Sequence, residues 1–376
     1  MQKKLIAIVV AAAFAPAVAA ADTGNVNVYG RLHASVDSID NGDASQNSSL
    51  FVNTNSSRFG VRGSEDLGGG TSAIFQIESN VNLTGTGIGG NGGGTTGAGN
   101  TSQSGNYGAF GGQVRDTFVG LSGGLGKIQI GRLPQENHWV YEMNLFADQP
   151  GDLGNMTSPI GGRSDGEILY TTPTFQGFTA NGQFYPASSH AGDGTFGSTA
   201  GTKNGWGTKI NYNAMGVNAS FNYLNRNNGT TALYQPIVFS ASYDFGAGLI
   251  GAQYMRDKRE VIVTNVTAKR NIFNVGGLYR VTPAVSIKGQ FSKAGDVTGA
   301  NAGTLVAGAN TGARMTALGV DYSFSKRTTA YLGYARTDND SAASVGVAGN
   351  GHNNQMPTFT AGQDPRAFSL GLTHNF

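Results

Sequence analysis

One acidic segment interrupts a chain whose other parts alternate apolar and polar residues. The segment is RLPQENHWVYEMNLFADQPGDLG (132–154), and its four acids are Glu136, Glu142, Asp148 and Asp152. Carboxylates and arginines stay charged only where water or an opposite charge is close by. These residue types therefore offer a local electric field beside water, although an ordinary solvated acidic loop would have the same composition.

Arginines that could oppose these acids occur near the start of the chain. Arg31 lies on the polar face of one alternating segment, and Arg58 and Arg62 lie on the polar face of the next. Alternation with a period of two is typical of a β-strand with two unlike faces, so these three side chains are predicted to share one wall. Arg132 is a fourth candidate. Its position in the alternation is that of the apolar residues, so its side chain would face outward unless a bulge near Gly131 turns it inward.

Alternating segments of this kind make up most of the chain, and together they predict an all-β protein. In VNASFNYLN (217–225), Val, Ala, Phe and Tyr take alternate positions, with Asn and Ser between them. Sixteen such strands are predicted. Tight turns such as NAMG (213–216) and FGAG (245–248) alternate with long connections such as 134–163. This pattern is typical of an up-and-down antiparallel meander, and an even number of strands lets the first pair with the last.

The two faces of these strands distinguish a soluble sandwich from a membrane barrel. A sandwich would bury the apolar face between two sheets, whereas an open sheet in lipid would leave backbone groups unpaired at its edges. A closed barrel turns Val, Ile, Leu, Phe and Tyr toward hydrocarbon and Asn, Ser, Gln, Lys and Arg toward a wet interior. The sequence therefore predicts a 16-stranded antiparallel transmembrane β-barrel with short periplasmic turns and long external loops.

The composition agrees with an exported protein. Residues 1–21, MQKKLIAIVVAAAFAPAVAAA, have the basic start, apolar centre and small-residue end of a cleaved signal peptide, which leaves 22–376 as the barrel domain. Removing Lys3 and Lys4 from the 25 basic residues leaves 23, against 23 acidic ones. A neutral chain lacks the clustered positive charge of a nucleic-acid-binding protein, and no nucleic-acid partner is expected.

No catalytic or cofactor motif accompanies the charged residues. The five His do not form a triad spacing with Ser and Asp, and the chain has no Cys and no HExxH. The Gly-rich stretch GGNGGGTTGAGN (89–100) lacks the lysine of a phosphate-binding loop. An enzyme is therefore not expected, nor a metal or cofactor. A surface adhesin with a plugged barrel stays open as an alternative.

Several segments, in order along almost the whole mature chain, resemble the general porins of Gram-negative proteobacteria. They are VNVYGRLHASVD, SSRFGVRGSEDLGGGTSAIFQIE, FVGLSGGLGKIQIGR, ILYTTPTFQGF, VDYSFSKRTTAYLGYA and FSLGLTHNF. The resemblance implies an outer-membrane homotrimer with one pore in each subunit. It also implies that the third long connection, about 134–163, folds into the lumen and narrows it, and it favours an inward Arg132.

This resemblance implies a general diffusion porin for ions and small hydrophilic solutes. Arg31, Arg58 and Arg62 would face the loop acids across the pore and create a transverse field, with a mild preference for anions. Phe376 would be the terminal aromatic signal for the barrel-assembly machinery, and outer-membrane lipid and lipopolysaccharide would surround the trimer. Two simpler interpretations stay open: the arginines as charges at the membrane rim, and Phe376 as the ordinary end of a strand.

Overall fold

The computed structural model describes ten ranges of the chain: 25–43, 48–84, 114–134, 142–157, 163–186, 203–227, 233–261, 264–302, 305–348 and 357–376. The predicted signal peptide and Glu136 lie outside them. Within these ranges, no helix is long and apolar enough to cross a membrane. The regular structure there is β-strand apart from one short 3-10 turn, η3 (Leu153–Asn155).

Nineteen strand segments follow one another along the chain. They are β1 (Asn25–Asp40), β2 (Ser49–Thr54), β3 (Arg58–Asp66), β4 (Ser72–Asn80), β5 (Thr117–Gly123), β6 (Gly126–Pro134), β7 (Arg163–Thr171), β8 (Phe178–Tyr185), β9 (Gly205–Ala214), β10 (Val217–Asn227), β11 (Leu233–Tyr234), β12 (Ile237–Asp244), β13 (Gly248–Val261), β14 (Val266–Arg280), β15 (Val285–Ala294), β16 (Thr298–Gly299), β17 (Ala313–Ser323), β18 (Thr328–Asn339) and β19 (Arg366–Asn375).

These segments form one closed antiparallel barrel of sixteen strands. β2 and β3 both pair with β1, β11 and β12 both pair with β10 and β13, and β15 and β16 both pair with β14, so each of these three couples is a single interrupted strand. Pro236 separates β11 from β12 because proline has no N–H to donate to the ladder. β1 pairs with β19 and closes the sheet. The predicted sixteen-stranded barrel is confirmed.

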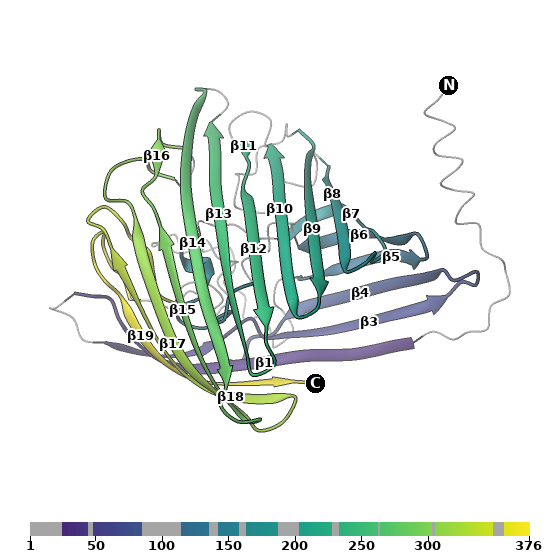
Figure 1. Ribbon diagram of the computed structural model, residues 1–376, viewed down its shortest axis with the longest axis horizontal. Helices are drawn as coiled ribbons and strands as arrows, with labels where there is room; N and C mark the ends of the chain where they lie inside the picture. Colours follow the sequence, from purple (N-terminus) through teal and green to yellow (C-terminus); the bar gives the residue numbers. More distant parts are fainter. Residues whose placement is uncertain are drawn as a thin grey trace.

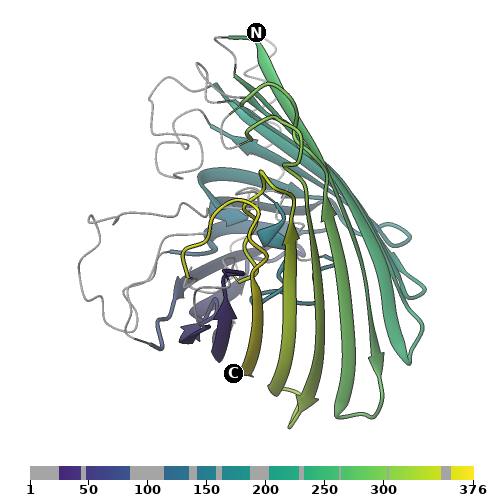
Figure 2. The ribbon, with the colours of Figure 1, turned by 90° about the vertical axis from the view of Figure 1, so that its left-hand side faces the viewer.

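Both walls of the barrel can be followed in the ribbon drawings. β10, β12, β13 and β14 lie side by side in one wall, and β1, β3 and β4 lie side by side in another (Figures 1 and 2). Most apolar side chains of these strands face outward and most polar ones face inward, although Val238, Met255 and Ile272 are buried inside against the segment 142–157. In β19, for example, Phe368 and Leu370 are exposed, whereas Ser369 between them is buried. A sheet with an apolar outer face and a polar inner face is suited to lipid outside and water inside.

The seam between the first and last strands depends on one glycine. The backbones of Gly30 and Phe376 exchange two hydrogen bonds, each 3.1 Å long. A Cβ atom on Gly30 would lie only 2.3 Å from the Phe376 ring. The ring can therefore lie across β1 only because residue 30 has no side chain.

Candidate pore constriction

The segment 142–157 lies against the inner wall of the barrel. Asn274 of β14 donates a side-chain hydrogen bond to the carbonyl of Met143 at 2.6 Å. Gln290 of β15 accepts from the amide of Leu145 at 2.9 Å and donates to the carbonyl of Gly151 at 3.2 Å. Both wall residues belong to the buried, inward-facing set. The described part of the loop 134–163 thus contacts inward-facing residues of the wall, and its role in narrowing the lumen stays a prediction.

Close apolar packing holds the middle of this segment. Phe146 is fully buried in a cluster with Ala317 of β17 and Ala335 of β18. Gly151 has φ +91, and a Cβ atom there would lie 2.5 Å from the Cβ of Ala317. A second inward segment, 340–348, contributes to the same cluster, and the carbonyl of Val347 accepts from the amide of Gly151 at 2.8 Å. Trp139 and Tyr141, which could pack beside Phe146, lie outside the described residues.

Two ion pairs tie the segment to different parts of the wall. At its first residue, Glu142 pairs with Lys209 of β9 and accepts a hydrogen bond from Ser220 of β10. In its middle, the carboxylate of Asp148 accepts from the Arg31 guanidinium of β1 at 3.0 Å and from the Ser56 hydroxyl at 2.7 Å. The segment therefore spans the inner wall from β9 round to β1.

Asp148 stays ionised although it is buried. Burial alone would raise the pKa of its carboxyl group, but the charge of Arg31, together with His33 and the hydrogen bond from Ser56, holds that pKa below its ordinary value. Asp148 also has φ +59, a conformation that Asp and Asn tolerate better than most residues. The backbone geometry and the ion pair thus fix this charge next to β1.

Asp152 has a different environment from the other described loop acids. Its carboxylate is fully buried and accepts hydrogen bonds from the amides of Asp148 and Gly154, at 2.8 and 2.7 Å, and from the Asn144 side chain at 2.7 Å. It therefore caps η3 and organises the loop from within. Burial, and then the neighbouring charge of Asp148, raises its pKa to about 6.

A cluster of arginines and one acid lines the wall beside Asp148. Arg31 and Arg58 lie directly opposite each other on β1 and β3. Glu78 of β4 pairs with Arg115 at 2.5 Å and with Arg58 at 3.9 Å, and its other hydrogen bond comes from the Tyr29 hydroxyl at 2.9 Å. Of the two adjacent cations, Arg58 thus pairs with a carboxylate of the wall and Arg31 with a carboxylate of the loop.

The wall contains further arginines beyond this cluster. The guanidinium of Arg62 lies 4.9 Å from the ring centroid of Tyr29, which is within cation–π range. Arg163 pairs with Asp116. Arg115 and Arg163 did not emerge from the sequence because they stand just before β5 and at the first residue of β7, where the alternation that located the other arginines stops.

Arg132 stands apart from the other predicted arginines. The ladder between β6 and β7 shifts register between Gly131 and Leu133, so the bulge considered from the sequence is present. The Arg132 side chain then pairs with Asp165 and donates to the carbonyl of Val114 at 2.8 Å. These contacts place its charge beside β7 and outside the cluster around Glu78.

Comparison with known proteins decides the family. The signature of the Gram-negative porin family matches residues 7–342. This chain belongs to the Gram-negative porin family. Outer membrane porin protein 32 of Delftia acidovorans is 26% identical to this porin over 400 residues, which cover all of both chains. Major outer membrane protein P.IB of Neisseria gonorrhoeae is 29% identical over 207 residues, which cover 52% of this chain and only 51% of the gonococcal protein.

Solved structures share the fold of this porin. An anion-selective porin from Comamonas acidovorans superposes with a TM-score of 0.72 at 22% identity, over 94% of this chain and 100% of that one. The trimer form of OmpT from Vibrio cholerae gives 0.66 at 14% identity, over 94% and 100%. These comparisons confirm the resemblance seen in the sequence and the predicted outer-membrane location. The porin family is a family of channels and not of enzymes. Within the described ranges, no three His, Asp or Glu side chains come together as a metal site.

Proposed function

We propose that this porin forms a water-filled channel for the passive diffusion of ions and small hydrophilic solutes. The observation that carries the proposal is the ion-paired segment inside the barrel, fastened by Glu142 to β9 and by Asp148 to β1. A segment held in this way narrows the lumen and sets its charge. Solutes that diffuse past this segment must be small and hydrated, because the side chains that line the lumen are polar.

The charges on the two sides of this constriction create a transverse field. Arg31, Arg58 and Arg62 form the basic wall, and Glu142 and Asp148 are the loop acids that oppose it. Among the described residues, no carboxylate lies within ion-pair distance of Arg62, and the buried Asp152 supports the shape of the loop. The wall therefore carries some uncompensated positive charge, which supports a mild preference for anions.

Planar bilayers test the channel and its selectivity together. Purified protein should give stepwise conductance, and its reversal potential in a KCl gradient should indicate anion preference. The triple variant Arg31→Gln, Arg58→Gln and Arg62→Gln should shift that potential toward cations. The triple variant Lys326→Gln, Arg327→Gln and Arg336→Gln is the matched control, because it also removes three positive charges, all of them from exposed side chains. A protein that inserts without conducting would instead favour a plugged adhesin barrel.

The functional unit that we propose is a homotrimer. The trimer form of a structural neighbour supports this, and so does the outer face of β1 to β5, which exposes aliphatic side chains such as Val26, Val28, Ile77 and Val119. Interfaces between subunits favour such apolar surfaces. Light scattering of the detergent-purified protein should give three chains per particle, and channels should insert in steps of three.

Export and assembly complete the proposal. Cleavage of residues 1–21 should expose an N-terminus near residue 22, which N-terminal sequencing of the mature protein measures. Phe376 would be read by the barrel-assembly machinery, and lipopolysaccharide and other outer-membrane lipids would contact the outer face. Phe376→Ala should lower the amount of folded barrel in outer-membrane fractions, whereas Phe324→Ala, which removes an exposed aromatic in a short turn, should not.

A further inference from the structure

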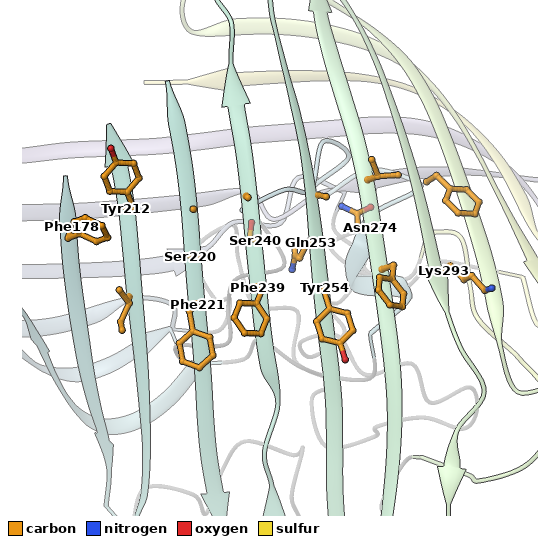
Figure 3. Close-up of a pocket in the computed structure, with 17 residues that line it drawn as sticks. Phe178, Tyr212, Ser220, Phe221, Phe239, Ser240, Gln253, Tyr254, Asn274 and Lys293 are labelled. Carbon is orange, nitrogen blue, oxygen red and sulfur yellow. The ribbon is translucent and has the colours of Figure 1, made fainter. Parts of the chain in front are cut away.

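Aromatic residues form a continuous row across four strands on the outer face. The cross-strand partners are Phe221 with Phe239, Phe239 with Tyr254, and Tyr254 with Phe273. Ring centroids lie 5.1 Å apart in the first couple and 5.0 Å apart in the last. Figure 3 shows the labelled rings of Phe221, Phe239 and Tyr254 at one level on neighbouring strands.

A groove runs beside this aromatic row because the next row is made of small residues. Ala219, Ala241 and Ala252 are cross-strand partners on β10, β12 and β13. The missing side-chain volume leaves a groove of about 750 Å³, which is within the size range of small-molecule sites. Its lining extends to Lys293 at one end (Figure 3).

The aromatic row continues into two unpaired cations. Phe273 is the partner of Lys293 on β15, and Lys293 is the partner of Arg314 on β17. Both side chains are exposed on the outer face. Within the part of the chain that the structure describes, neither forms an ion pair or a side-chain hydrogen bond. Like charges directly opposite each other destabilise a sheet. An anion bound between Lys293 and Arg314 would remove this repulsion.

The position of the couple indicates the source of that anion. Phe221 is the fifth of the eleven residues of β10, near the middle of that strand, whereas Arg314 is the second residue of β17, next to a long connection. The row therefore climbs from the middle of the barrel wall to the long-loop end. Lys269 and Lys258, a second couple of opposed lysines on β14 and β13, lie at that same end. Basic residues at a membrane surface attract anionic headgroups.

We propose that this face binds a phosphorylated, multiply acylated membrane lipid, with a phosphate between Lys293 and Arg314 and an acyl chain along the alanine row. The inference rests on the proposed outer-membrane channel, and it names one lipid site on its surface. Phosphate oxygens satisfy the ammonium and guanidinium donors at once. The aromatic row and the alanine row would contact the acyl chain of the lipid. One ligand would thus account for both the two unpaired cations and the apolar groove.

Native mass spectrometry of the full-length mature porin with lipid A as the probe tests this site. Lys293→Gln with Arg314→Gln should weaken binding of diphosphorylated lipid A about 30-fold, which corresponds to about 2 kcal/mol. Lys326→Gln with Arg327→Gln is the control, because it removes the same charge from an exposed short turn. Ala241→Trp, which fills the groove, should also weaken binding of lipid A.

Several results would overturn the site. They are equal binding of dephosphorylated lipid A, an equal loss in the control variant, and displacement of lipid A by inorganic phosphate at the same concentration, which would indicate an adventitious ion only. A change in subunit number with Ala241→Trp, without loss of lipid A, would make the groove a protein interface. Conductance of the same samples separates the two proposals, because lipid binding by a non-conducting barrel would refute the channel alone.

Discussion

Replacing Asp148 by Asn should make the channel more selective for anions. The change removes one negative charge from the constriction and leaves Arg31, 3.0 Å away, without its ionic partner. Asn keeps an oxygen that can accept from the Ser56 hydroxyl, now 2.7 Å from the carboxylate. It also tolerates the φ of +59 at this position. The variant thus changes charge with little change in shape, which alanine would not achieve.

The size of the effect follows from Coulomb's law. A unit charge about 5 Å from a passing ion in water contributes about 0.8 kcal/mol. Screening at about 0.1 M salt, with a Debye length of about 10 Å, reduces this to about 0.5 kcal/mol. That energy favours an anion by about two-fold and disfavours a cation by the same factor. The permeability ratio of anion to cation should therefore rise about five-fold.

The reversal potential in a KCl gradient measures this ratio directly. Asp338→Asn serves as the control, because it also removes one carboxylate but from an exposed pair with Arg336 on β18. We expect the control to leave the ratio unchanged. An unchanged ratio in Asp148→Asn, or a shift toward cations, would show that Asp148 does not act on the ions in the lumen, and the assignment of the constriction would be wrong.

Three further changes test other parts of the structure. Asp152 has an ordinary pKa of 3.8 and a folded-state pKa of about 6, so the folded loop binds more protons and loses about 3 kcal/mol as pH rises from about 4 to 6. Hydrogen exchange of segment 142–157, corrected for intrinsic rates, should show this loss, and Asp152→Asn should abolish it; equal pH dependence in both proteins would contradict it. Gly30→Ala should weaken the barrel seam, because its Cβ would meet the Phe376 ring at 2.3 Å, whereas Gly333→Ala has 4.0 Å of room; heat-modifiable electrophoresis should show less folded barrel only for the first. Lys209→Gln frees the Glu142 charge and should shift the reversal potential toward cations, while Lys326→Gln should leave it in place.

Strands were predictable because alternation and turns fix them locally. The prediction of 204–213 compares with β9 at Gly205–Ala214, and that of 365–376 compares with β19 at Arg366–Asn375. The extensions of β13 to Val261 and of β14 back to Val266 were not predicted, since the connection between them lacks a sharp turn signal. Cross-strand pairing, more than local pattern, determines where such long strands end.

The candidate site was predictable only for residues whose inward or outward direction follows from the alternation along a strand. Parity assigned Arg31, Arg58 and Arg62 to one face, and the structure places all three on the inner wall. Parity could not show that Asp152 would be buried as a cap, because that depends on how the loop folds on itself. The alignment of Lys293 with Arg314 depends on register between strands, which is set by turn geometry and is not visible in one segment alone.

Closure between β1 and β19 has a consequence for how the chain is made. Asp40 and Arg366 form a hydrogen bond although they lie 326 residues apart in the sequence. Contacts so distant in sequence form late in folding, because the entropy of closing the loop is lost before the contact stabilises the chain. Until then the nascent sheet has two free edges that can recruit other strands. A truncated chain would keep both edges open permanently, so unfinished copies should be prone to aggregation and should depend on chaperones and proteases for their removal.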